Sequence, residues 1–347
     1  SVRDQGASLL VNERVSSYRG ESAERLWIHT FQMINFLALG EAEGAAVEAR
    51  RAVRTLEEHE ETFAADPVTR LLAAMSFEAA GQIDAASVEY RRLVGEDGSE
   101  AAAGLPDGVL RAAWLNARRT ARVEVATRLA GAMSEQGRTA ARRTLESREG
   151  ELVVLLADGF VPPKRAGNLL LAPDLRISFP YYPDYVRSAI GETLEVRVNG
   201  QRAAMAPIVT RLGTVAEASL AARAKGVAAR QTVRAVTKQG IGAAASKENE
   251  ALGLLVGAAL MLLEEADTRG WQTLPGRWAL VEQALPAGEH RLEVRAGPDR
   301  RAVLEAVPIR AGATSVIVLG DGPGGLSRIT PLASPPAPPG PVPVVDG

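Results

Sequence analysis

The sequence FLALGEAEGAA at residues 36–46 returns in outline as FEAAGQIDAAS at residues 77–87, and this repeat decides the fold of the first half of the chain. Aligning the two turn glycines also aligns their neighbours: Gly40 with Gly81, Phe36 with Phe77, and Ala45 with Ala86. Apolar residues stand at helical spacing before each glycine, and alanines stand at helical spacing after it. The pattern predicts two helical hairpins whose second helix lies close to the first.

These hairpins resemble the tetratricopeptide repeat, whose unit has a turn glycine, a small alanine five residues on and an aromatic residue after that. Gly81, Ala86 and Tyr90 match all three positions, whereas Ala49 replaces the aromatic residue in the first unit. A third, degenerate hairpin is expected at residues 110–117 and 123–133. Because such units bury their apolar faces by stacking, an array of only two or three should also pack against the rest of the chain.

After about residue 150 the pattern changes to β structure. Residues 151–157 form a short apolar run, typical of a strand buried on both faces, and residues 193–198 alternate before Asn199-Gly200, a strong hairpin signal. Four more short strands are expected, at residues 278–285, 291–296, 302–309 and 314–319. Helical periodicity returns at residues 215–238 and 246–266. We interpret this half as a small antiparallel β-sandwich interrupted by a helical pair.

The predicted fold class is therefore α+β, with three regions. A tetratricopeptide-like helical domain is expected at residues 1–149 and a β-rich domain at 150–320, with a helical insertion at about 213–268. Residues 321–347 are expected to form an extended Gly/Pro-rich tail, since residues 331–347 hold seven of the 20 prolines.

Composition excludes several classes of chemistry. The 347 residues include no cysteine and three histidines, which rules out disulfides, thiolate metal sites and cysteine nucleophiles. Lys+Arg 40 against Asp+Glu 42 gives a net charge of −2, so no overall field favours nucleic acid. The apolar stretch at residues 251–263 is shorter than the ~20 residues that span a bilayer, and we expect a core helix there.

Each candidate for a reactive site has a better structural explanation. The glycine-rich residues 240–245 lack the strand–turn–helix context of a dinucleotide site, and residues 321–325 lack the ending of a phosphate loop. No serine stands in a nucleophile elbow, and His290 lies in an alternating strand without a partner motif. We therefore expect no catalytic residue, no cofactor and no metal site, and a protein that is not an enzyme.

The helical repeats predict a binding surface instead. Stacked hairpins form a concave surface that is lined by the first helix of each unit and can hold a peptide or a partner helix. The residues expected to line it are Arg25, His29, Gln32, Asn35 and Phe36 of the first unit and Arg70 and Phe77 of the second. In an alternative of equal weight, the β domain of the chain itself fills this groove.

The whole pattern also resembles a family of uncharacterised bacterial cell-envelope proteins, typically lipoproteins, with a tetratricopeptide-like region followed by a β domain. The resemblance covers residues 5–320 and is carried by residues 35–51, by 150–154 with Gly159 and Pro162, and by 266–275 with 285–288. It implies a periplasmic location, attachment to the outer membrane through a lipidated cysteine upstream of this sequence, and no catalytic residue.

The most specific piece of that resemblance is the segment ADTRGWQTLP at residues 266–275. We expect a structural role for it. Trp271 and Pro275 would anchor a helix-to-strand crossing, and Arg269 would pair with Asp267 or cap the preceding helix.

The leading hypothesis is a non-enzymatic scaffold or adaptor of the cell envelope that binds protein partners through its helical-repeat surface. Its expected partners are other proteins of an envelope complex or a second copy of the chain, with no nucleic acid and with the membrane reached through a lipid anchor alone. One alternative is a hydrolase or glycan-acting enzyme with a site between the domains. Another is a self-assembling structural subunit that uses its Pro-rich tail as an arm.

Overall fold

The computed structural model describes residues 18, 20–95, 105–146, 149–172, 175–183, 194–202, 207–222, 266–297, 300–311, 314–322 and 325–328. Its contacts divide the chain into two compact units, each assembled from three segments. Unit 1 comprises Ser1–Glu24, Val161–Arg187 and Gly213–Leu274, and unit 2 comprises Arg25–Phe160, Ser188–Leu212 and Pro275–Gly347. The boundary expected at residues 149/150 stays a prediction, whereas the extended tail expected from residue 321 is wrong at its start, because β10 (Thr314–Gly322) and β11 (Gly325–Arg328) pair there as strands.

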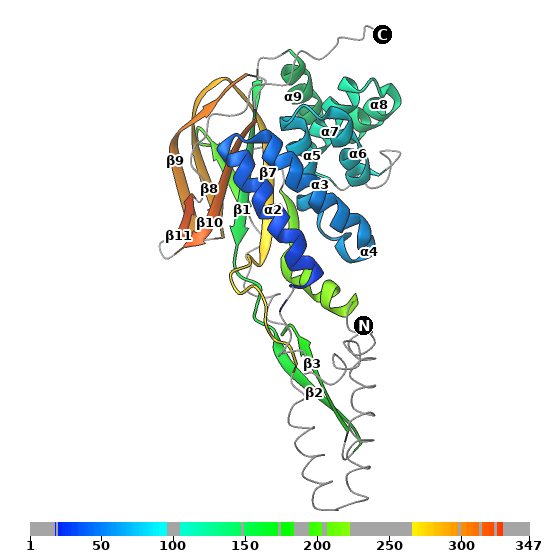
Figure 1. Ribbon diagram of the computed structural model, residues 1–347. Coiled ribbons are helices and arrows are strands. Elements are labelled where there is room, and N and C mark those ends of the chain that lie inside the picture. Colours follow the sequence, from blue (N-terminus) through cyan, green and yellow to red (C-terminus); the bar gives the residue numbers. More distant parts are fainter. Residues whose placement is uncertain are drawn as a thin grey trace, which may run out of the picture. The chain divides into compact units, whose positions relative to one another are not determined.

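Helical hairpins make up the first half of the chain, as the sequence predicts (Figure 1). The helices are α2 (Ser22–Leu39), α3 (Ala42–Glu58), α4 (Glu60–Phe63), α5 (Pro67–Ala79), α6 (Ile83–Val94), α7 (Asp107–Arg119), α8 (Val123–Ala132) and α9 (Glu135–Leu145). Three hairpins result, α2/α3, α5/α6 and α7/α8, so the expected degenerate third hairpin is confirmed.

The same turn closes all three hairpins. After α2, the backbone N–H of Glu41 donates to the carbonyl of Phe36 at 2.8 Å, and the corresponding bonds run from Gln82 to Phe77 and from Arg122 to Ala117 at 2.8 Å each. This bond is the signature of a helix end with one residue in the left-handed conformation. That residue is Gly40 (φ 75°), Gly81 (φ 70°) and, in the third hairpin, Ala121 (φ 54°). The alanine five residues on is buried in each case: Ala45, Ala86 and Ala126.

Two packed sheets form the β half. The five-stranded sheet has the order β11-β10-β1-β7-β6, and the four-stranded sheet has the order β5-β4-β8-β9. The strands are β1 (Glu149–Asp158), β4 (Leu194–Val198), β5 (Gln201–Arg202), β6 (Ile208–Arg211), β7 (Arg277–Pro286), β8 (Gly288–Ala296), β9 (Arg300–Ile309), β10 (Thr314–Gly322) and β11 (Gly325–Arg328). All strands expected from the alternating and apolar runs are present.

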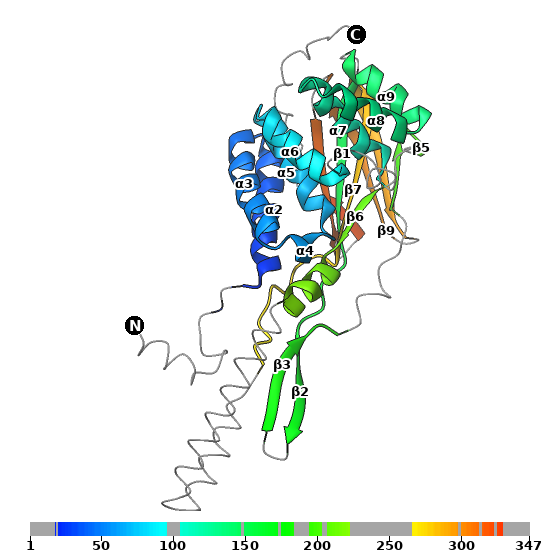
Figure 2. The same cartoon turned by 90° about the vertical axis from the view of Figure 1, so that its right-hand side faces the viewer.

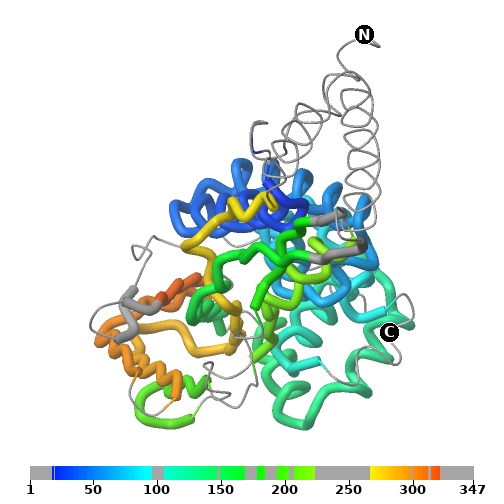
Figure 3. Tube along the Cα trace, turned by 90° about the horizontal axis from the view of Figure 1, so that it is seen from below, coloured from blue at the N-terminus to red at the C-terminus, as the bar shows by residue number. Residues whose placement is uncertain are grey.

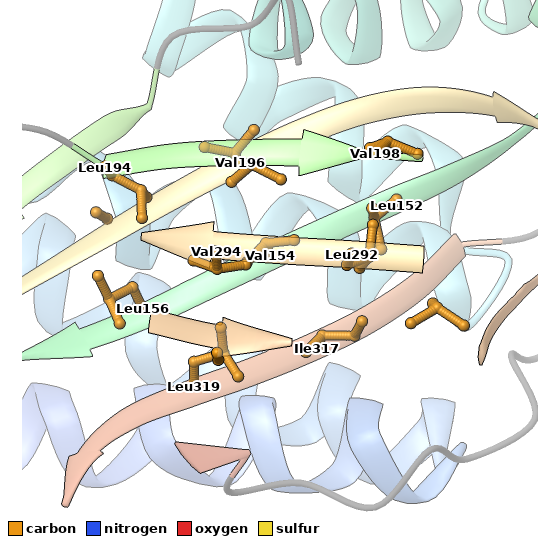
Figure 4. Packing of buried hydrophobic residues seen from close by; sticks show 14 of the residues in the cluster. Leu152, Val154, Leu156, Leu194, Val196, Val198, Leu292, Val294, Ile317 and Leu319 are labelled. Atoms are coloured by element: carbon orange, nitrogen blue, oxygen red, sulfur yellow. The ribbon is translucent and has the colours of Figure 1, made fainter. Parts of the chain in front are cut away.

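The sandwich core lies between these two sheets. Leu152, Val154 and Leu156 project from one face of β1 toward Val196 of β4 and Val294 of β8, as Figure 4 shows. Side chains from β7, β9 and β10 complete the cluster. Because alternate residues of a strand point to opposite faces, the remaining apolar residues of β1 belong to its other face.

One detail of the expected sandwich is wrong, since the five-stranded sheet is mixed and not antiparallel. Strand β1 pairs antiparallel with β7 but parallel with β10, in a register that runs from Glu151–Thr314 to Ala157–Gly320. Parallel neighbours need a long crossover connection, and here the long stretch of chain between β1 and β10 supplies it.

The helices cover the second face of the five-stranded sheet (Figures 2 and 3). Phe31 of α2 packs edge-on against Trp278 of β7 with ring centroids 5.1 Å apart, and the N–H of Val68 in α5 donates to Thr210 Oγ1 of β6 at 3.1 Å. The first helices of the hairpins therefore face the sheet through residues such as Phe31 and Val68, which are not among those expected to line a groove. Strand β1 is buried on both faces, as its apolar run predicts.

Five of the described strands have no expected range in the sequence analysis: β2 (Arg165–Ala172), β3 (Leu175–Tyr181), β5, β6 and β11, although the Asn199-Gly200 hairpin signal marks the turn into β5. Strands β2 and β3 pair with each other in unit 1, and β11 pairs antiparallel with β10. Residues 212–222 are the described start of the inserted helical region. The second inserted helix, the glycine-rich residues 240–245 and residues 329–347 lie outside the described residues. None of the described helices has the length and apolar character needed to cross a bilayer.

Candidate functional site

The seven residues expected to line a binding groove fall into two sets. Four of them are engaged inside the helical array. His29 Nδ1 lies 2.7 Å from Glu48 Oε2, Arg70 Nη1 donates to Glu89 Oε2 at 2.7 Å, and Phe77 is buried. Phe36 covers Gly44 so closely that a Cβ there would lie 2.7 Å from its ring. Arg25, Gln32 and Asn35 are exposed on α2, so a binding role stays a prediction for all seven.

The three exposed residues belong to a longer row that the sequence analysis missed. Ile28 and Leu39, large apolar residues that are 49% and 58% exposed, lie on the same face of α2. We call Arg25, Ile28, Gln32, Asn35 and Leu39 the α2 stripe. Their spacing of three, four, three and four residues is that of the seam positions of a coiled coil. This spacing is visible in the sequence and is the signal that could have revealed the row.

Aligning the three hairpins shows what happens to the equivalent positions of the α2 stripe in the two later hairpins. The residues that correspond to Ile28, Gln32 and Asn35 are buried in both later hairpins: Thr69, Ala73 and Ser76 in α5, and Val109, Ala113 and Asn116 in α7. Two of them, Thr69 and Asn116, contact the hairpin before their own. Thr69 Oγ1 lies 3.1 Å from Thr30 Oγ1 of α2, and Asn116 Nδ2 donates to the carbonyl of Ile83 at 3.2 Å. The α2 stripe is thus the face on which a preceding hairpin would stack, and none precedes it in the described residues.

A second candidate is a buried group of carboxylates where α7 meets the five-stranded sheet. Arg111 of α7 pairs with Glu151 of β1, and Glu282 of β7 lies beside them. Burial raises the pKa of Glu282 to about 8; the neighbouring negative charge of Glu151 adds to this rise and Arg111 opposes it. The pKa of Glu78 on α5 is also raised by burial, against the opposing effect of Arg119 at 3.2 Å.

The first turn of α7 closes this carboxylate group off. A Cβ on Gly108 would lie 2.8 Å from the Cβ of Glu282, so the helix backbone rests directly on that side chain. Glu282 is 3% exposed, and its Oε2 has no hydrogen-bond partner within the described part of the chain. Glycosidases use a pair of carboxyl groups whose environments push their pKa values apart, but here burial raises the pKa of both Glu282 and Glu151, and Glu282 lies directly under the helix.

A third polar cluster ties together the segments of unit 1. Lys164, whose side chain is 1% exposed, donates from Nζ to Glu21 Oε1 at 3.0 Å. Tyr18 donates to Glu24, whose other oxygen accepts from the backbone N–H of Trp271 at 2.7 Å. Every charge in this cluster has a partner, as buried charges require, so a structural role accounts for it.

The segment at residues 266–275 takes part in that cluster. Arg269 Nε donates to Asp267 Oδ1 at 2.8 Å, which is the pairing expected from the sequence. Partial burial alone would raise the pKa of Asp267, but the hydrogen bonds from the Arg269 side chain and backbone lower it. Trp271 Nε1 donates to Thr273 Oγ1 at 2.8 Å, and Pro275 is buried just ahead of β7.

His290 is satisfied within the four-stranded sheet. Its Nε2 lies 2.8 Å from the carbonyl of Pro286, and its Nδ1 lies 3.1 Å from Asn199 Nδ2. Nε2 therefore donates and Nδ1 accepts, which leaves neither nitrogen for proton transfer. The described residues include no group of three or more acidic, histidine or cysteine side chains placed to hold a metal ion.

Comparisons with protein-family models, with curated proteins and with solved structures find no match for this chain. The resemblance to envelope proteins accordingly stays an expectation, and the α2 stripe is the strongest candidate surface.

Proposed function

We propose that this protein is a non-enzymatic scaffold that binds a protein partner through the α2 stripe. One observation carries the proposal: Ile28, Gln32 and Asn35 are exposed on α2, whereas the residues at the same positions of α5 and α7 are buried, and Thr69 and Asn116 among them contact the neighbouring hairpin. The partner takes the place of that neighbour.

The character of the stripe supports this role. Repeat arrays that end in solvent have terminal units with a polar outer face, because an apolar face would promote association. Ile28 and Leu39 give the outer face of α2 two large apolar side chains instead. Fully burying such a side chain stabilises a complex by about 1.5–3 kcal/mol, so the pair can anchor an interface.

The cell envelope is proposed as the place of this function. Its basis is the resemblance carried by residues 35–51, 150–154 and 266–275. In this proposal the protein works on the periplasmic side, is held at the outer membrane by a lipid on an upstream cysteine, and joins a larger assembly there.

A photo-crosslinking residue at Gln32 tests the proposed surface in cells that make the protein. The matched control is the same residue at Arg142, which is exposed on α9 outside the stripe. We expect protein adducts from Gln32 and none above background from Arg142. Equal yields at the two positions, or no adduct at Gln32, would contradict the proposal.

A second candidate, a hydrolase or glycan-acting enzyme, has the raised pKa of Glu282 beside Glu151 in its favour. It requires α7 to move, because Gly108 lies on Glu282. The test is hydrolysis of peptidoglycan and simple esters by the purified chain and by Glu282→Gln. Turnover that the substitution abolishes would establish the enzyme, and no turnover by the unaltered chain would dismiss it.

A further inference from the structure

We infer that the partner on the α2 stripe is a second copy of this chain, with the two α2 helices antiparallel about a two-fold axis between Met33 and Ile34. The inference rests on the proposed function, because it names the partner of the same surface. Its basis is the order of side chains along the stripe, which is the same when read from either end.

The apolar and amide positions of the stripe are symmetric about that midpoint. In antiparallel helices related by a two-fold axis, residues equally far from the axis on opposite sides lie at the same height. Ile28 then meets Leu39 of the second copy, and Gln32 meets Asn35. Each apolar side chain contacts an apolar one and each amide contacts an amide, and both contacts occur twice.

Other registers lose this match. Sliding one helix by a single seam position places Ile28 opposite Asn35, which buries an amide against an aliphatic side chain. Burying a polar group without a hydrogen-bond partner is costly, so the symmetric register is specified over its neighbours. Within one copy, Asn35 Nδ2 lies 3.4 Å from Gln32 Oε1, so the two amides already sit together on the helix surface.

Charges at the ends of the stripe match in the same register. Arg25 lies opposite the start of α3 in the second copy, where Glu41 and Glu43 are both exposed. The two-fold axis repeats this contact, which gives two arginine–carboxylate pairs at the rim. Pairs at a rim add specificity more than affinity and weaken as salt screens them.

A self-complementary stripe favours a second copy over an unrelated helix. An interface between identical copies requires residue i to contact j while j contacts i. Ile28 with Leu39 and Gln32 with Asn35 stand at equal distances from the midpoint and satisfy this requirement. A hairpin of another protein would not require the stripe to match itself.

The test is sedimentation velocity of the full chain over a micromolar concentration range, with circular dichroism to confirm folding. We expect a monomer–dimer equilibrium that Leu39→Lys weakens at least tenfold. Val123→Lys is the matched control, because Val123 is 56% exposed on α8 and lies outside the stripe. Arg25→Glu should also weaken the dimer, and adding Glu43→Arg should restore it.

The antiparallel register has its own measurement, because the sequence contains no cysteine. Ile28→Cys combined with Leu39→Cys should give a covalent dimer under mild oxidation, whereas Ile28→Cys combined with Val123→Cys should not. The inference is overturned by a chain that stays monomeric at about 100 μM, or by a dimer that Leu39→Lys leaves intact. If Gln32 forms adducts with another protein and none with a second copy of this chain, the inference is overturned and the proposed function is supported. If Gln32 forms no adduct at all, the proposed function itself is overturned.

Discussion

Glu282 is the residue whose surroundings most change its chemistry. It lies under α7 between Glu151 and Arg111, and its pKa is raised from 4.5 to about 8. Between about pH 4.5 and pH 8, Glu282 keeps its proton in the native state and releases it in the unfolded state, so the free energy of unfolding falls as pH rises. The contribution is present at low pH and is lost as pH approaches 8.

Glu282→Gln should remove this dependence, since the amide keeps the shape of the protonated acid. Between about pH 6 and pH 8 the unfolding free energy of the unaltered chain should fall relative to the variant by up to about 1.4 kcal/mol per pH unit. Denaturant unfolding at several pH values measures the difference. Parallel curves for the two proteins would show that Glu282 is ionised in the fold.

Asp66 is the second residue with a large predicted effect. It begins α5 and accepts four hydrogen bonds, from Trp27 Nε1, the backbone N–H and hydroxyl of Thr69, and Thr210 Oγ1. Asp66→Ala leaves these buried donors without an acceptor and should cost about 3 kcal/mol of unfolding free energy. Asp84→Ala, at an exposed site in the first turn of α6, is the control and should change it by less than about 0.5 kcal/mol.

Sequence reasoning did not find these residues for a physical reason. Glu282 is the single acid in a mostly apolar strand, and Arg111 looks like one of many arginines on helix surfaces. Their burial depends on α7 packing across β1 and β7, contacts between residues far apart in the chain. Asp267 and Arg269 were predicted to pair because they are two residues apart, and local geometry alone brings them together.

At the scale of elements, the turns that close the hairpins offer the clearest test. The third turn places Ala121 at φ 54°, where the first two have glycine at φ 75° and 70°. A side chain in the left-handed conformation costs roughly 1–2 kcal/mol. Ala121→Gly should therefore raise the unfolding free energy by about 1 kcal/mol.

The matched opposite change is Gly81→Ala, where nothing lies within 4 Å of the added Cβ, so conformational strain alone acts. It should lower the unfolding free energy by about 1 kcal/mol. Thermal or denaturant unfolding of the two variants checks the pair. Destabilisation of the third hairpin by Ala121→Gly would mean that its turn is not strained.

The elements that the sequence predicted share a strong local signal. Hairpins with a turn glycine and a small alanine, and strands with clear alternation or apolar runs, all appear near their expected bounds. Strands β6 and β11 have four residues each, too few to show a period. The parallel pairing of β1 with β10 was missed because the two strands are about 160 residues apart in the sequence. A local sequence pattern does not show which strands become neighbours in a sheet.

At the scale of the whole molecule, the main correction concerns the groove. The sequence left open whether partners or the β half would occupy the first helices of the hairpins. Contacts such as Phe31 with Trp278 place the sheet against these helices, but through residues other than the seven expected to line the groove. Three of those seven residues, Arg25, Gln32 and Asn35, stay exposed on α2.

The central claim is that the α2 stripe is covered by protein in the native envelope, and solvent access at Leu39 tests it most directly. With no native cysteine, Leu39→Cys and the matched control Val123→Cys can each be labelled with a maleimide. Leu39 and Val123 are 58% and 56% exposed in the isolated chain, so dilute purified protein should label equally at both. In the intact envelope we predict labelling at least tenfold slower for Leu39→Cys than for Val123→Cys. Equal rates there would contradict the account.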